Sequence, residues 1–193
     1  MAELNYTDDN IKTLEWNVHI RQRPGMYIGR LGNGNNESDG IYVMLKEIVD
    51  NSIDEFAMGF GKQISIDIEG HKVTVRDYGR GIPLGSLIPA VSKLNTGGKY
   101  DNDQYTASVG LNGVGLKAVN ALALKFTACS YRNGEFHRAT FEQGRLVNDE
   151  TGKTEEEDGT FISFEPDPAL FVGCRFHSEF VKDMLRNYTY LNT

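Results

Sequence analysis

Residues 41–58 read IYVMLKEIVDNSIDEFAM, and this stretch decides the kind of fold that the chain can adopt. Its apolar positions recur at helical spacing, which predicts one long helix with one face against a core. Residues 63–69 and 72–77 then alternate apolar and polar side chains, which predicts two strands joined by a tight turn. The predicted core-facing stripe of the helix consists of Ile41, Leu45, Ile48, Val49, Ser52 and Phe56.

The segments on either side extend this pattern of helix and hairpin. Pro24 and Gly25 predict a turn after a first helix, and residues 96–112 are rich in Gly, Asn, Asp and Ser, which is typical of a functional lid. Strands do not alternate regularly with helices, which argues against a Rossmann fold. We therefore expect an α+β two-layer sandwich, with a mixed, mainly antiparallel sheet and helices on one face. The further expected elements are helices over residues 14–22, 87–94, 114–124 and 178–191, and strands over residues 125–131, 135–142 and 159–165.

Composition narrows the class of protein. The 193 residues suit one domain, no apolar run approaches the roughly 20 residues of a membrane span, and the polar start does not resemble a signal peptide. Cys129 and Cys174 are expected to be reduced thiols of a cytoplasmic protein. The net charge is −7 with scattered Lys and Arg, so the main site for DNA is not expected in this domain.

The first candidate for chemistry is the polar side of the helix over residues 41–58. Glu47 and Asn51 are four residues apart, and Asp54 or Glu55 lies one turn further along the same side. An amide oxygen for Mg²⁺ and a carboxylate to orient water could project together from one rigid element. Taken alone, such a stripe is more often a solvated helix face.

Two glycine-rich segments are further candidates. Residues 77–83 read DYGRGIP at a strand end, where Asp77 could accept a hydrogen bond from the adenine amine and the glycines allow a flat base to approach. Residues 110–115 read GLNGVG and open a helix whose first turn contains Lys117, which favours a phosphate site. The alternatives are an ordinary tight turn and a glycine-rich loop that matches no nucleotide fingerprint. Lys99 could swing over the phosphates from a glycine hinge.

The order of these motifs resembles the GHKL ATPase superfamily, which includes gyrase, the Hsp90 chaperones, histidine kinases and MutL. Within it, the chain resembles the B subunits of type IIA DNA topoisomerases over essentially its whole length. RQRPGMYIG at residues 21–29 is similar to a segment that the other members lack, and EIVDNSIDE at residues 47–55 is similar to another. GGKY at residues 97–100 and VNAL at residues 119–122 match further segments.

The resemblance implies a role for each matching residue. Glu47 would be the general base for the water that attacks the γ-phosphate, and Asn51 would bind Mg²⁺. Asp77 would hold the adenine amine with a water shared by Gly81 and Thr160, and Arg80 would cover the base and pair with Glu55. Other expected ATP-binding residues are Tyr6 with Ile11 from an arm of the partner, Ile82 and Pro83 beside the base, Lys99 and Tyr105 from the lid, and Gly110, Leu111, Asn112, Gly113, Val114, Gly115, Leu116 and Lys117 around the phosphates. Competitive inhibitors are expected to use Asp77, Arg80 and Arg138.

The resemblance also implies partners and domain limits. Residues 1–13 would be a dimerisation arm and residues 14–193 the ATP-binding domain, with ATP clamping two B subunits together. The A subunit and DNA would bind to other domains, among them a transducer that supplies a second lysine, so this chain is expected to bind ATP well and hydrolyse it slowly. LNGVG at residues 111–115 replaces the usual LHGVG, and residues 81–96 form a short segment. With Lys117, these departures favour topoisomerase IV over gyrase.

Other classes remain as alternatives. A MutL or Hsp90 type of ATPase lacks the RPGMYIG segment. A histidine kinase would need a phosphoacceptor, and His19, His71, His137 and His177 have no such context. A nucleotide sensor without catalysis would not need Glu47.

Overall fold

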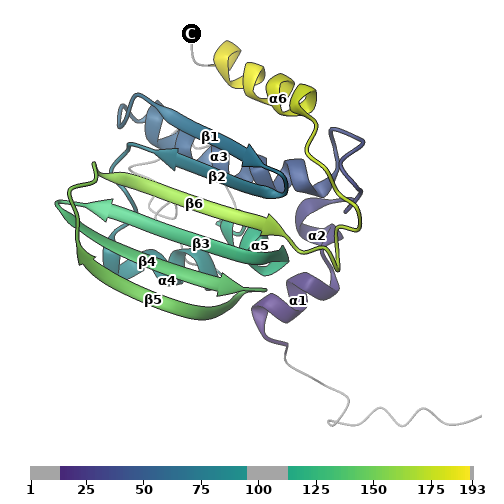
Figure 1. The fold of residues 1–193 in the computed structure, drawn as a ribbon, viewed down its shortest axis with the longest axis horizontal. Helices are drawn as coiled ribbons and strands as arrows, with labels where there is room; N and C mark the ends of the chain where they lie inside the picture. Colours follow the sequence, from purple (N-terminus) through teal and green to yellow (C-terminus); the bar gives the residue numbers. More distant parts are fainter. Residues whose placement is uncertain (1–13, 95–112, 192–193) are drawn as a thin grey trace, which may run out of the picture.

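The protein is built on one six-stranded sheet covered by helices (Figure 1). The structure, a computed structural model, describes residues 14–94 and 113–191. The strand order is β1-β2-β6-β3-β4-β5, and each neighbouring pair is antiparallel. The strands are β1 Ile64–Glu69, β2 Lys72–Asp77, β3 Ala123–Arg132, β4 Glu135–Glu142, β5 Arg145–Lys153 and β6 Gly159–Pro166.

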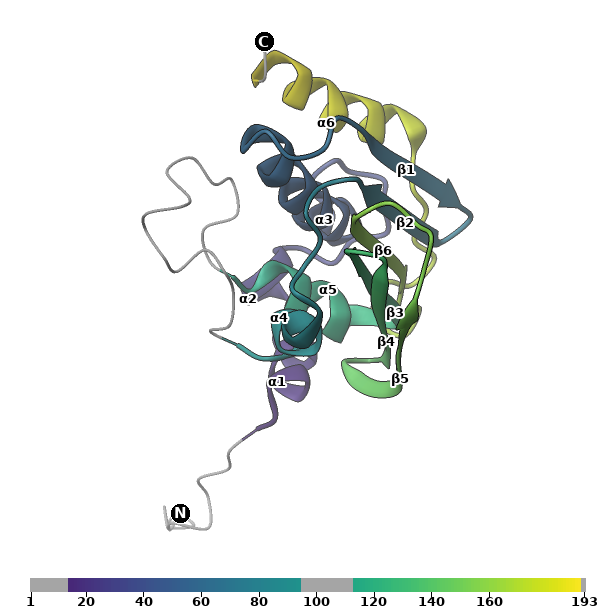
Figure 2. The ribbon, with the colours of Figure 1, turned by 90° about the vertical axis from the view of Figure 1, so that its left-hand side faces the viewer.

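The helices form a second layer on one face of the sheet. Figure 2 shows α1, α3, α4 and α5 on that side, with α6 beyond the β1 edge. Among the described residues, no helix combines the length and apolar character that a bilayer crossing requires. The helices are α1 Trp16–Gln22, α2 Gly25–Ile28, α3 Gly40–Ala57, α4 Leu87–Ser92, α5 Gly115–Leu122 and α6 Ser178–Leu191, with a 3₁₀ turn, η2, at Leu84–Ser86.

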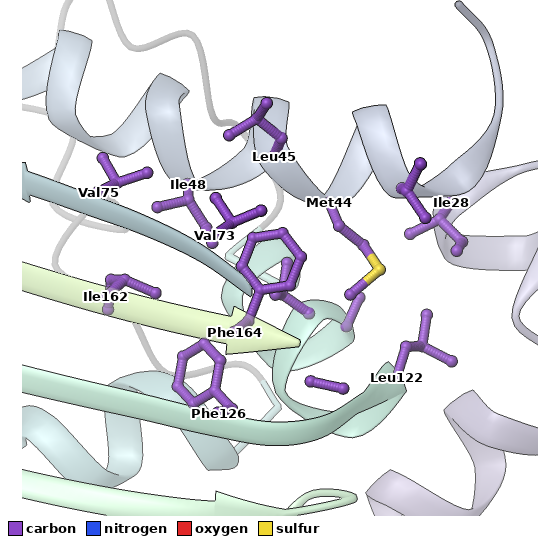
Figure 3. Close-up of a cluster of buried hydrophobic side chains, with 14 of the residues drawn as sticks. Ile28, Met44, Leu45, Ile48, Val73, Val75, Leu122, Phe126, Ile162 and Phe164 are labelled. Atoms are coloured by element: carbon purple, nitrogen blue, oxygen red, sulfur yellow. The ribbon is translucent and has the colours of Figure 1, made fainter. Parts of the chain in front are cut away.

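The core lies between α3 and the middle strands of the sheet. Figure 3 shows α3 side chains facing β2, β6 and β3, and these residues are almost wholly buried. The predicted stripe of α3 is buried except for Phe56, which is 40% exposed at the end of the helix. Because α3 packs against the sheet along its length, the polar side of the helix is held in one position relative to the sheet. The labelled core residues are Ile28, Met44, Leu45, Ile48, Val73, Val75, Leu122, Phe126, Ile162 and Phe164.

The final helix, α6, is attached to α3. The hydroxyl of Tyr188 donates to the buried carboxylate of Asp50, which also accepts from Lys46 at 2.6 Å. Phe180 meets the ring of Tyr42 edge to face at 5.6 Å between centroids. These contacts join both ends of α6 to the helix that contains the candidate site residues.

The predicted fold class is confirmed, and three details differ from expectation. Every strand pairing in the described sheet is antiparallel, where a mixed sheet was expected. The strand β5 was not predicted. Gly25 begins the short helix α2 instead of a simple turn, with Pro24 at the N-cap position, where its fixed φ is compatible with a helix start.

Candidate functional site

Asp77 is the last residue of β2, and its carboxyl group is buried against α3. One oxygen, Oδ1, accepts hydrogen bonds from the backbone N–H groups of Gly79 at 3.0 Å and Thr160 at 3.1 Å. The other oxygen lies 3.4 Å from the hydroxyl of Ser52 on α3. Burial raises the pKa of Asp77, while the bonds from Gly79 and Thr160 act in the opposite direction. The backbone therefore fixes the orientation of this carboxyl group.

Gly81 lies where the loop after β2 touches the ends of β3 and β6. Its φ is +69°, and a Cβ atom there would lie 2.7 Å from the carbonyl oxygen of Tyr131 and 2.8 Å from the hydroxyl of Ser130. Both the left-handed backbone and the close approach require glycine. Arg132 donates to the Gly81 carbonyl at 3.2 Å, so this loop is held against the hairpin of β3 and β4.

Glu55 on α3 and Arg80 in the loop after β2 form a bidentate ion pair. Arg80 donates from Nε at 3.1 Å and from a terminal nitrogen at 2.9 Å, and its backbone N–H reaches the same carboxylate at 3.2 Å. The guanidinium also lies over the ring of Phe60 at 4.1 Å. Arg80 is therefore a pre-positioned flat cation beside Asp77, because two rigid contacts orient it.

Glu47 and Asn51 project from the middle of α3. The Asn51 amide nitrogen donates to the Glu47 backbone carbonyl at 2.6 Å, so its nitrogen is turned toward the helix. The Glu47 carboxylate reaches the first residue of α5, where a Cβ atom on Gly115 would overlap Oε2. The absent side chain at Gly115 is what allows the carboxylate to lie against this helix start.

Lys117 is a buried cation in the first turn of α5. Its side chain is 2% exposed, and its ammonium donates to the carbonyl of Gly113. Burial lowers the pKa of Lys117 from 10.5 to about 8. A cation at a helix N-terminus opposes the helix dipole. Lys117 and the N–H groups of the turn over residues 113–115 thus make a local environment that suits an anion.

The start of α5, Asp77 and Arg80 all contact α3, at successive positions along the helix. Glu47 meets the start of α5, Ser52 meets Asp77, and Glu55 meets Arg80. From Glu47 to Glu55 the helix rises about 12 Å, at about 1.5 Å per residue. Of the predicted groups that the structure describes, Glu47, Asn51 and Glu55 lie on α3, Gly115 lies beside Glu47, and Asp77 lies beside Ser52.

The donor set fits a nucleotide with Mg²⁺. Among the described residues, no three acidic, His or Cys side chains cluster as a metal site, so a protein-only Mg²⁺ cage is not formed by them. Mg²⁺ takes few protein ligands when phosphates supply the others, and the Asn51 oxygen is a suitable one. The missing side chain at residue 115 lets the Glu47 carboxylate lie directly beside the backbone N–H groups at the start of α5.

Arg138 is not brought to this site. It lies on β4 next to His137, whose ring faces the helices, so alternation places Arg138 on the opposite face of the sheet. There it lies 3.7 Å from Glu150 and over the ring of Phe136. The arginine of this hairpin that does reach the Gly81 loop is Arg132, which was not among the residues expected from the sequence.

The other predicted residues divide into two groups. Val114 occupies the N-cap position of α5, Leu116 is half-buried in its first turn, and Ile82 and Pro83 continue the loop after Gly81. The predicted roles of Tyr6, Ile11, Lys99, Tyr105, Gly110, Leu111 and Asn112 lie outside the described residues.

Comparison with known proteins places this fold among ATPases. The chain belongs to the histidine kinase-, DNA gyrase B- and HSP90-like ATPase family, whose model matches residues 36–170. It is 50% identical over its whole length to the B subunit of DNA topoisomerase 4 from Borreliella burgdorferi. It is 40% identical over 97% of its length to the B subunit of DNA gyrase from Campylobacter jejuni. It spans 32% and 25% of those relatives.

A solved structure gives the same assignment. The 43K ATPase domain of Thermus thermophilus gyrase B, in complex with an aminocoumarin, matches 92% of this chain and 46% of its own, with a TM-score of 0.76 and 29% identity. Together these matches confirm the family resemblance and the fold that the motifs predicted.

Proposed function

We propose that the line of residues along α3 binds ATP with Mg²⁺ and hydrolyses it. The adenine would lie at the Asp77 end, where the carboxyl group accepts a hydrogen bond from the base amine, and Arg80 would cover the base. The phosphates would lie at the Gly115 end. A ligand that touches both ends must be about as long as this stretch of α3, which suits a nucleoside triphosphate.

The proposed chemistry depends on Glu47 and the start of α5. Glu47 would take a proton from the attacking water, while Lys117 and the backbone N–H groups over residues 113–115 stabilise charge on the phosphate oxygens. Asn51 would hold Mg²⁺, which when bound neutralises phosphate charge. Gly81 and Thr160 would share a water with the base. Tyr6, Lys99, Tyr105 and residues 110–112 are proposed to complete the site.

We further propose that the parent protein is a type IIA DNA topoisomerase, with topoisomerase IV favoured over gyrase. The support is the 50% identity to a topoisomerase 4 subunit, against 40% to a gyrase subunit. ATP binding would clamp two B subunits together for DNA strand passage in the cytoplasm, with the A subunit and DNA held through other domains. The net charge of −7 agrees with DNA binding elsewhere. ATP-dependent strand passage by the full-length protein tests this step.

The observation that carries the proposal is the Glu47 carboxylate at the start of α5, on the same helix that backs Asp77. A calorimetric titration of the chain with ADP and ATP, with and without Mg²⁺, tests binding. We expect Mg²⁺ to strengthen binding, because it neutralises phosphate charge. Absence of nucleotide binding by the wild-type chain would refute the proposal.

A pair of variants separates binding from catalysis. Glu47→Ala should retain ATP binding within about threefold and lose single-turnover hydrolysis, because the proton acceptor acts mainly in the transition state. Asp77→Asn should weaken ATP binding about tenfold or more, because it replaces one of the acceptor oxygens with a donor. Unchanged hydrolysis in Glu47→Ala would exclude the assigned base.

A further inference from the structure

The loop that follows Asp77 and Gly79 has an unusual set of hydrogen-bond partners. Four consecutive carbonyl groups, from Gly81 to Leu84, each accept a hydrogen bond. The Pro83 carbonyl accepts from the backbone of Ser86 at 2.7 Å. The other three accept from side chains of the hairpin formed by β3 and β4, namely Arg132 at 3.2 Å, Ser130 at 2.6 Å and His137 at 2.6 Å. The Leu84 carbonyl also accepts from the backbone N–H of Leu87.

Side chains hold this loop because the sheet does not. Strand β2 ends at Asp77, so the carbonyl groups that follow have no ladder partner. Pro83 also lacks an N–H group, which interrupts any regular pattern of donors. A carbonyl group left unpaired in a buried place costs the folded state about 1–3 kcal/mol in general. The three hairpin donors therefore attach the loop to the sheet, while the backbone bonds of Ser86 and Leu87 shape its end.

Ser130 and His137 act from directly opposite positions of the hairpin. They are cross-strand partners in the register of β3 and β4, and both are nine-tenths or more buried. The Nδ1 atom of His137 must be the donor to Leu84, because a carbonyl oxygen only accepts. Its Nε2 atom lies 2.6 Å from the carboxylate of Asp149 on β5, which fixes the ring from the other side.

The hairpin is also connected to Asp77, the residue proposed to bind the base. Ser130 pairs with Thr160 in the register of β3 and β6, and the Thr160 N–H is one of the two backbone donors to Asp77. Ser130 thus links the loop at Ile82 to the strand that orients the Asp77 carboxyl group. A shift of the loop relative to β6 would change the separation between Asp77 and the loop.

We propose that Ser130 and His137 are positioning residues that set the preference of this site for adenine over guanine. The inference rests on the proposed nucleotide site. Adenine presents an amine donor at its sixth position and guanine a carbonyl acceptor, so a carboxyl acceptor at Asp77 discriminates between them only when the base lies in register with it. The loop from Gly81 to Leu84 is the surface that fixes this register, and the hairpin donors fix the loop.

The test compares ADP with GDP, which carry the same phosphates. Calorimetric titration should show that the wild-type chain binds ADP more tightly than GDP. Ser130→Ala should weaken ADP binding by about tenfold, because the Ile82 carbonyl loses its side-chain donor. His137→Phe should weaken ADP binding by a smaller factor, because the Leu84 carbonyl keeps the backbone N–H of Leu87. Both variants should leave GDP binding nearly unchanged, so the ratio of ADP to GDP affinity falls in both, and further in Ser130→Ala. Ser130→Thr keeps the hydroxyl group and should restore the wild-type ratio.

A matched control comes from the same hairpin. Thr140 on β4 contacts Thr127 on β3 through their hydroxyl groups at 3.3 Å, at positions that alternation places on the face away from the helices. Thr140→Val should lose that contact without changing the ratio. If Ser130→Ala does not fold, as judged by circular dichroism, the ratio for His137→Phe decides.

The outcomes separate the two proposals. A wild-type chain that binds neither nucleotide would overturn the nucleotide site itself. A wild-type chain that prefers ADP, with the same ratio in the folded Ser130→Ala and His137→Phe variants, would overturn only the positioning role. A fall in the ratio equal to that in Thr140→Val would also overturn it, because the effect would then be one of general hairpin stability.

Discussion

At the scale of single residues, Lys117 is a group that suits an anion and lowers the free energy of unfolding of the nucleotide-free chain. Its ammonium group is buried at the start of α5, and burial lowers its pKa from 10.5 to about 8. The folded chain therefore releases this proton near pH 8, while the unfolded chain keeps it to about pH 10.5. Between those values the unfolded chain holds more protons, so the free energy of unfolding rises with pH in that window. Below about pH 8 the buried charge is a destabilising feature.

We predict that Lys117→Met raises the melting temperature of the nucleotide-free chain at pH 7 by about 6 °C or more. The lowering of the pKa from 10.5 to about 8 corresponds to roughly 3 kcal/mol, and about 2–4 °C accompanies each kcal/mol in a chain of this size. The gain should shrink between about pH 8 and pH 10.5, and the variant should bind ATP more weakly. Thermal unfolding at several pH values measures this.

The control for this prediction is Lys62→Met, since Lys62 is an exposed lysine. It should leave the pH dependence of the melting temperature unchanged. An equal or lower melting temperature for Lys117→Met at pH 7 would contradict the assignment of a destabilising buried charge.

The sequence predicted the pairing of Arg80 with Glu55, which the structure shows, but it did not predict which arginine of the hairpin of β3 and β4 reaches the Gly81 loop. Glu47, Asn51 and Asp77 lie in motifs whose residue spacing and order along the chain can be recognised in the sequence alone. Arg132 and Arg138 belong to one predicted hairpin, and the face that each one occupies depends on strand register. A one-residue change of register exchanges the two faces, and sequence patterns do not set that register closely.

At the scale of elements, the meeting of α3 and α5 depends on one missing side chain. A Cβ atom at Gly115 would overlap the Glu47 carboxylate, the far end of a flexible side chain. We predict that Gly115→Ala displaces this carboxylate more than it destabilises the fold. Single-turnover ATP hydrolysis should slow by at least about tenfold, because small displacements of catalytic groups have large effects. The melting temperature should change by no more than about 2 °C.

The matched control is Gly85→Ala in the turn η2, where no atom lies within 4 Å of the added Cβ. It should retain both hydrolysis and melting temperature. Wild-type hydrolysis by Gly115→Ala would show that the contact with Glu47 has no part in catalysis.

The sequence predicts a helix or a strand correctly where one face of that element is buried, because apolar residues then mark the buried face. The strands β2 and β6 alternate apolar and polar residues, and α3 has a continuous apolar stripe. The strand β5 has almost every side chain exposed, so it lacks the alternation that marks a strand. Its formation follows from pairing with β4 across a turn in which Gln143 and Gly144 have positive φ. Tertiary pairing, rather than local pattern, creates this strand.

At the scale of the whole molecule, α6 is held by a buried hydrogen bond to α3. The Tyr188 hydroxyl donates to Asp50, and burial, followed by the neighbouring carboxylates, raises the pKa of Tyr188. We predict that Tyr188→Phe lowers the free energy of unfolding by about 1–2 kcal/mol, because a buried acceptor loses one of its donors. Chemical denaturation measures the change.

An exposed position on the same helix supplies the comparison. Lys182→Ala should change the free energy of unfolding by less than about 0.5 kcal/mol. Equal stability of Tyr188→Phe and the wild type would mean that α6 is held by its apolar contacts alone.

The attachment of α6 to α3 has a mechanical implication. Asp50 lies on the same turn of α3 as Glu47 and Asn51, and Glu55 follows within two turns. A displacement of α6 is therefore transmitted to α3, which contains both Glu47 and Glu55, the partner of Arg80. Under the proposed function, recognition of the base and cleavage of the phosphate would then change together.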